Sequence, residues 1–92
     1  MNKFKLHFFQ QVREYIATLP PDTKKQFNRE LENLSGGGGD IHSLKDNLEG
    51  YWRLRIGHHR VIYFYAAGLA IECVYAGERA TIYENFVPPG KN

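Results

Sequence analysis

Cysteine is almost absent from this chain of 92 residues, in which Cys73 stands alone. A single thiol can neither close an internal disulfide nor supply a thiolate-rich metal site, which excludes a disulfide-stabilised exported scaffold. Long apolar runs are missing as well: nothing approaches the ~20 residues of a membrane-spanning helix, and no apolar run of signal-peptide length opens the sequence. We therefore expect a soluble protein of the reducing cytoplasm, with no membrane partner.

The chain is too short for separate substrate and regulatory modules. We expect one domain over residues 1–92, and the 42% hydrophobic and 14% aromatic content is enough to fill a single core.

Net charge is only +2, which does not identify a nucleic-acid-binding protein. Acidic residues, however, are absent between Glu49 and Glu72. That window contains five arginines and histidines: Arg53, Arg55, His58, His59 and Arg60. The positive charge is therefore local.

Hydrophobic spacing in the first third of the chain predicts a strand and two helices. Apolar residues at every second position predict a short strand over 4–8. The spacing then changes to three and four, which predicts a helix over about 9–18, ended by Pro20-Pro21. A second helix, capped by Asp22 or Thr23, completes an antiparallel hairpin.

Four consecutive glycines end the second helix, and residues 35–43 are expected to form a flexible connector. The run lacks the Gly-Lys-Ser/Thr ending of a phosphate-binding loop, because Asp40 follows it. His42 is expected to lie at the surface of this connector without a further role.

The last part of the chain, rich in aromatic and β-branched residues, predicts an antiparallel meander. The expected strands cover residues 51–56, 59–65, 69–76 and 80–84, with turns at Gly57-His58, Ala67-Gly68 and Gly77-Glu78. The fold is thus expected to be α+β, with a short N-terminal strand, a helical hairpin, a three- to four-stranded meander and a disordered tail over 87–92.

Alternation in the first meander strand separates an arginine face from a core face. Tyr51, Arg53 and Arg55 fall on one side, and Trp52, Leu54 and Ile56 on the other. A two-residue turn would set Arg55 opposite Arg60, a like-charge pair that costs roughly 0.2–1 kcal/mol and has no folding benefit. Such a face suits a polyanion; charge pattern alone equally allows a solvated surface whose arginines pair with nearby carboxylates.

The stretch from Leu44 to Tyr63 resembles the RelE/ParE toxin superfamily. It carries a leucine-rich lead-in, Gly-Tyr-Trp, Arg-Leu-Arg, a Gly turn and Arg-Val-Ile-Tyr. The later Gly77-Glu78-Arg79 with Ile82-Tyr83 is similar to the closing element of that family. The order of strand, helical hairpin and meander extends the likeness over nearly the whole chain.

The resemblance implies a ribosome-dependent endoribonuclease that cleaves messenger RNA by attack of a 2′-hydroxyl on the adjacent phosphate, and that a cognate antitoxin silences. It implies no metal and no other cofactor. Arg60 and Arg79 would stabilise transition-state charge, while Tyr83 would stack on a base or take part in proton transfer. Arg53 and Arg55 would grip the phosphate backbone, with Tyr51 and His58 beside them.

Well-known members of the family carry lysines where this chain has Arg53 and Arg55, and arginine cannot serve as a general base. We therefore expect proton transfer from His58 or His59 at the hairpin tip, with His59 the stronger candidate. A zinc site is not expected, because adjacent histidines on a strand point to opposite faces.

Two other classes remain open on the same fold. One is a non-enzymatic binder, either a ParE-like poison of DNA gyrase or an inactive module that binds only its antitoxin. The other is a housekeeping α+β domain, which leaves the facing arginines unexplained. In the toxin reading the partners are the antitoxin, the ribosome and mRNA.

Overall fold

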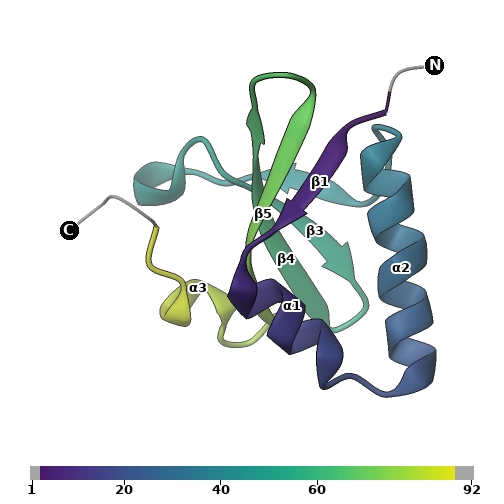
Figure 1. Ribbon diagram of the computed structural model, residues 1–92. Helices are drawn as coiled ribbons and strands as arrows, with labels where there is room; N and C mark the ends of the chain where they lie inside the picture. Colours follow the sequence, from purple (N-terminus) through teal and green to yellow (C-terminus); the bar gives the residue numbers. More distant parts are fainter. Residues whose placement is uncertain (1–2, 89–92) are drawn as a thin grey trace.

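The computed structural model describes residues 3–88, and its centre is a five-stranded sheet (Figure 1). The strands lie in the order β1 (Lys5–Phe8), β5 (Ala70–Glu78), β4 (His59–Ala66), β3 (Trp52–Ile56) and β2 (Ile41–Ser43). β1 runs parallel to β5, and every other neighbouring pair is antiparallel. The expected α+β class is therefore confirmed.

Two helices cover one face of the sheet. α1 (Gln10–Ala17) and α2 (Pro21–Ser35) supply Val12, Phe27 and Leu31 to a core that also contains Leu54 and Val61. Pro20, in extended backbone, precedes the first turn of α2, with Pro21 the first helical residue and no capping side chain. The predicted cap at Asp22 or Thr23 is wrong, because a proline needs no amide partner at the first helical position.

The opposite face carries a smaller apolar cluster. Ile62 and Val74 of the sheet pack with Ile82 and Phe86 of the C-terminal segment. The 3₁₀ turn η1 (Asp46–Leu48) adds Leu48 to the margin of this cluster. α3 (Ile82–Asn85) is thereby held on this face.

The meander follows the predicted order, with two corrections. Gly57 and His58 form the turn between β3 and β4, as expected. β5 continues through Glu78, so the predicted turn at Gly77-Glu78 is wrong. The strand predicted over 80–84 is wrong too, since this segment forms α3 and buries Ile82 and Phe86 one helical turn apart.

The connector after α2 contains a strand that the sequence does not reveal. β2 pairs Ile41 with Leu54 and His42 with Arg53. Gly39, with φ of 101°, lies so near β3 that a Cβ there would stand 3.0 Å from Leu54 Cδ1. A glycine is required at this turn both for its backbone angle and for its contact.

Residues 89–92, which include most of the tail expected to be disordered, lie outside the described residues. None of the helices within residues 3–88 is long and apolar enough to cross a bilayer.

Candidate functional site

Arg53 and Arg55 project from β3 on the face opposite α1 and α2. Their neighbours Leu54 and Ile56 are fully buried against the helices, so the alternation of the strand directs the two arginines to the other side. Arg53 is half-buried and Arg55 is exposed. The predicted separation of arginine face and core face is confirmed.

Arg60 joins them from β4. The Gly57-His58 turn pairs Ile56 with His59 and sets Arg55 directly opposite Arg60, as predicted. The Arg60 guanidinium folds back on the turn, where Nη1 donates to the carbonyl oxygens of Gly57 and His59, each at 2.9 Å. Backbone acceptors therefore hold this guanidinium beside a second cation.

Arg79 and Tyr83 approach from the segment after β5. The Arg79 amide donates to the carbonyl oxygen of His58 at 2.9 Å, which ties this segment to the β3–β4 turn. Tyr83 lies in α3 with its side chain exposed. Both residues reach the neighbourhood of Arg60 although they are distant from it in sequence.

The electrostatic surroundings of Arg60 identify the cluster. Burial lowers the pKa of Arg60, and the positive charges of Arg53, Arg55 and Arg79 lower it further, whereas Tyr83 acts in the opposite direction. Four charged or polar side chains thus act on Arg60. The structure brings together the arginines and the tyrosine that the sequence singled out, and we call these five residues the arginine cluster.

Carboxylates neutralise only part of the arginine cluster. Asp40 pairs with Arg53 at 3.4 Å and with Arg55 at 3.8 Å. Within residues 3–88, neither Arg60 nor Arg79 forms an ion pair. Like charges held together without matching carboxylates favour an external anion.

His42 is exposed, as expected, and it also lies on the face of the arginine cluster. It lies opposite Arg53 in the β2–β3 register. Directly opposite residues in an antiparallel pair share a face and have Cβ atoms about 4.5–5.5 Å apart. His42 therefore places a titratable imidazole beside the arginine cluster. Only the pairing of β2 reveals this position.

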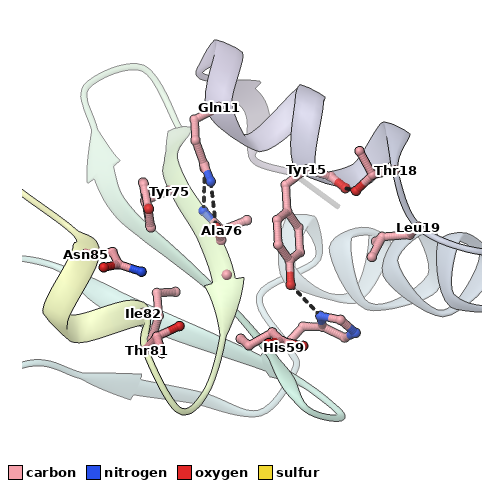
Figure 2. A pocket seen from close by; sticks show the side chains of 12 residues that line it. Gln11, Tyr15, Thr18, Leu19, His59, Tyr75, Ala76, Thr81, Ile82 and Asn85 are labelled. Atoms are coloured by element: carbon pink, nitrogen blue, oxygen red, sulfur yellow. Dashed lines mark hydrogen bonds between the residues drawn. The ribbon is translucent and has the colours of Figure 1, made fainter.

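His59 lies on the other face, so its expected place beside the arginines has to be corrected. Its Nδ1 is 2.7 Å from the Tyr15 hydroxyl (Figure 2). Its ring also meets Phe27 edge-on at a centroid distance of 5.3 Å. Strand alternation places His59 with the helical core when Arg60 faces away from it. Burial, followed by the charge of Glu78, raises the pKa of Tyr15.

Tyr51 and His58, the other two residues expected near the phosphate, differ in burial and in their contacts. Tyr51 is half-buried, and its ring packs edge-on against Phe64 and Phe86 at 5.8 and 5.3 Å. His58 is exposed in the turn, where its carbonyl oxygen accepts the amide of Arg79. Tyr51 packs at the margin of the smaller apolar cluster. The backbone of His58 holds Arg79 beside the β3–β4 turn.

A cavity of about 470 Å³ lies apart from the arginine cluster, between α1, α3 and the end of β5 (Figure 2). Gln11 crosses its wall and exchanges two hydrogen bonds of 2.7 Å with the backbone of Ala76. Its side-chain amide thus provides hydrogen-bond partners for the Ala76 backbone of β5, beyond the point where β1 has ended. None of the arginines lines this cavity.

Within residues 3–88, no group of three or more His, Cys, Asp or Glu side chains is arranged to hold a metal ion.

No family model matches the chain, and no curated protein matches it in sequence. Solved structures do match. The RelBE2 toxin–antitoxin complex of Mycobacterium tuberculosis contains a chain that is 19% identical, with a TM-score of 0.73 over 84% of this chain and 99% of that one.

Two further matches have TM-scores of 0.67. The YoeB–YefM complex of Staphylococcus aureus contains a chain that is 26% identical over 84% of this chain and 98% of that one. The YoeB/ParE toxin of Agrobacterium tumefaciens is 22% identical over 83% and 99%. This chain has the fold of the RelE/ParE toxin superfamily.

Proposed function

We propose that this protein is the toxin of a type II toxin–antitoxin system and cleaves messenger RNA on the ribosome. The observation that carries the proposal is geometric: Arg55 pairs with Arg60 across the β3–β4 turn, and the Arg79 amide is bonded to the same turn. The fold supports it, since similar chains occur in structures described as toxin–antitoxin complexes. The partner proposed for this chain is accordingly an antitoxin.

The proposed reaction joins the ribose 2′-oxygen to the adjacent phosphorus and breaks the bond from phosphorus to the 5′-oxygen. A base takes the 2′-hydroxyl proton, and an acid supplies a proton to the departing 5′-oxygen. The phosphorane between these steps carries extra negative charge, which Arg60 and Arg79 stabilise from positions without carboxylate partners. The reaction as written needs no redox partner.

His42 is the proposed base. It lies on the face of the arginine cluster, where a neutral imidazole accepts the proton that arginine cannot accept. Tyr83, whose hydroxyl interacts electrostatically with Arg60, is the proposed donor to the leaving oxygen. His59 has no part in this scheme, because its ring is hydrogen bonded to Tyr15 on the helical face.

The decisive experiment removes Arg60 and Arg79 together. Arg60→Gln with Arg79→Gln is expected to abolish growth arrest and to slow message cleavage on programmed ribosomes by at least about 10²–10³-fold, the usual cost of losing one transition-state donor. The matched control removes two charges from the exposed surface of α2, with Lys25→Gln and Arg29→Gln. This control is expected to cut at the wild-type rate, and circular dichroism verifies that both proteins are folded.

Other outcomes point to the other classes. Growth arrest with intact messages and inhibited gyrase would indicate a gyrase poison. Absence of arrest, with an antitoxin still bound, would indicate an inactive binding module. Equal cleavage by the double variant and its control would contradict the proposed role of the arginine cluster.

A further inference from the structure

Asp40 carries the one carboxylate that approaches the arginine cluster within ion-pair distance in residues 3–88. Its Oδ1 lies 3.4 Å from Arg53 Nη1, and its Oδ2 lies 3.8 Å from Arg55 Nη1. Both oxygens therefore point between two guanidinium groups on neighbouring positions of one strand face. An anion in this place has cations on two sides, as a phosphate group would.

The backbone of Asp40 forms hydrogen bonds that do not depend on its carboxylate. Its carbonyl oxygen accepts from Arg53 Nη1 at 3.1 Å and from the Arg55 amide at 2.9 Å. These two bonds attach the loop to β3 and hold the Arg53 guanidinium whatever the charge of the side chain. The carboxylate is therefore not required to position Arg53.

The contacts of the carboxylate are weak by comparison. Charge-assisted hydrogen bonds between guanidinium and oxygen are about 2.7–2.9 Å long, and both separations here are greater. The Asp40 side chain is 55% exposed and that of Arg55 is 53% exposed, so that water and salt screen this pair, whereas Arg53 is 19% exposed and its pair is screened mainly from the side of Asp40. A phosphodiester that offers two oxygens to the guanidinium groups would displace this carboxylate by rotating its side chain, without opening the loop.

We propose that the space between Arg53 and Arg55 is a second phosphate subsite, which binds a phosphodiester flanking the scissile one and which Asp40 occupies in the free protein. The inference rests on the proposed function, because it assigns the scissile phosphate to Arg60 and Arg79. It divides the arginine cluster into a chemical half without carboxylates and a binding half with an internal competitor. The Asp40 carboxylate weakens the binding of non-cognate polyanions. An RNA strand that is already aligned at Arg60 and Arg79 displaces it.

The test compares Asp40→Asn with Asp46→Asn. Both substitutions remove one negative charge and keep the shape of the side chain. Asp46 is exposed, forms no ion pair within residues 3–88 and has a φ of 57°, which asparagine tolerates. Single-turnover cleavage is measured on ribosomes programmed with a message, as a function of protein and salt concentration.

Asp40→Asn is expected to lower the half-saturating protein concentration by about two- to fivefold at low salt, in line with an exposed ion pair. The plot of log affinity against log salt is expected to steepen by about 0.7, the value for one additional phosphate charge on a single strand. Asp46→Asn is expected to match the wild type. In a background of Arg53→Gln and Arg55→Gln, the effect of Asp40→Asn is expected to disappear.

An unchanged half-saturating concentration and salt slope would overturn the subsite, and so would a lower maximal rate, which would mean that the carboxylate positions the arginines. The wild-type protein distinguishes failure of the proposed function: if it does not cleave the message, the proposed reaction is refuted. Cleavage by wild type with no effect of Asp40→Asn removes the subsite alone.

Discussion

His42 and His59 lie on opposite faces of the sheet, and strand register decides which of them reaches the arginine cluster. His42 pairs with Arg53, whose side chain lies on the arginine face. His59 pairs with Ile56, which is buried under the helices, and its ring contacts Tyr15. Nearness to Arg60 in the sequence is therefore a poor guide to nearness in space.

The same substitution at both histidines tests this division. His42→Gln is expected to slow cleavage at neutral pH by about 10²–10⁴-fold and to remove the rise of the rate with pH, because the glutamine amide cannot take the 2′-hydroxyl proton. His59→Gln is expected to keep the wild-type pH profile. It loses the bond to Tyr15, which lowers the free energy of unfolding by about 0.5–1.5 kcal/mol.

Rate profiles from pH 5 to 9 and urea titrations measure the two effects. A flat profile in His59→Gln together with a normal one in His42→Gln would reverse the assignment and return proton transfer to the hairpin tip.

The sequence was sufficient for the position of Arg60 but not for that of His42. A two-residue turn after Ile56 determines that Arg55 faces Arg60, and local turn chemistry is visible in sequence. His42 and Asp40 depend on how β2 pairs after a glycine run, and nothing local sets that register. The positions of His42 and Asp40 beside the arginines therefore depend on long-range pairing, which the sequence does not reveal.

At the scale of elements, the glycine run acts as a shaped turn between α2 and β2. The amides of Gly36, Gly37 and Gly38 all bond to carbonyl oxygens in the last turns of α2. Gly39 then turns the chain into the sheet at a φ of 101°, against Leu54. This turn brings Asp40 and His42 to the arginine face.

Two glycines of the run provide a matched comparison. Gly37 and Gly39 both have positive φ, at 91° and 101°. A Cβ added at Gly37 would have no atom within 4 Å, whereas a Cβ added at Gly39 would lie 3.0 Å from Leu54 Cδ1. Gly37→Ala is expected to lower the free energy of unfolding by about 1 kcal/mol from backbone strain alone. Gly39→Ala is expected to cost about 2–3 kcal/mol, because the methyl group also displaces a buried leucine.

Urea unfolding measures both, and cleavage by Gly39→Ala is expected to fall as well, since the turn carries Asp40 and His42. Equal losses of stability in the two variants would mean that Leu54 moves aside freely and that the close approach has no structural consequence.

The segment after β5 illustrates where pattern reading fails. Residues 80–84 have the β-branched and aromatic content of a strand, yet Ile82–Asn85 forms the helix α3. Helical spacing allows Ile82 and Phe86 to be buried together against Ile62 and Val74. Ile62 and Val74 form this apolar surface only once the sheet has folded, so the local sequence does not reveal it. The long elements, by contrast, have enough periodic positions to be read from sequence alone.

At the scale of the whole molecule, the two faces of the sheet have different roles. The helical face contains the larger apolar core, whereas the other face combines a small apolar cluster with the arginine cluster. Separating them lets charge accumulate on one side while the other side stabilises the fold. Stability and cleavage are therefore expected to respond to different substitutions.

Tyr63 and Cys73 link the stability of the helical core to pH. They are cross-strand partners, and both are fully buried. Burial, with a smaller effect of Glu72, raises the pKa of Cys73 to about 12, and burial also raises the pKa of Tyr63, with added effects of Tyr65 and Cys73. The Tyr63 hydroxyl has no hydrogen-bond partner within residues 3–88.

These shifts predict that the protein loses stability in alkaline solution. Below the pKa of the unfolded groups, about 8.5 for a thiol and about 10 for a phenol, both states hold their protons and pH has no effect. Above it, the unfolded chain ionises while the folded chain stays protonated, so the free energy of unfolding falls as pH rises.

Tyr63→Phe separates the phenol from the rest of this effect. At pH 7, Tyr63→Phe is expected to raise the free energy of unfolding by up to about 1 kcal/mol, because it removes a buried hydroxyl without a partner. The advantage over wild type is expected to widen in urea titrations at pH 10.5, where the unfolded Tyr63 ionises. A constant difference between Tyr63→Phe and wild type at the two pH values would mean that the folded phenol ionises as readily as the unfolded one, so that burial does not hold its proton.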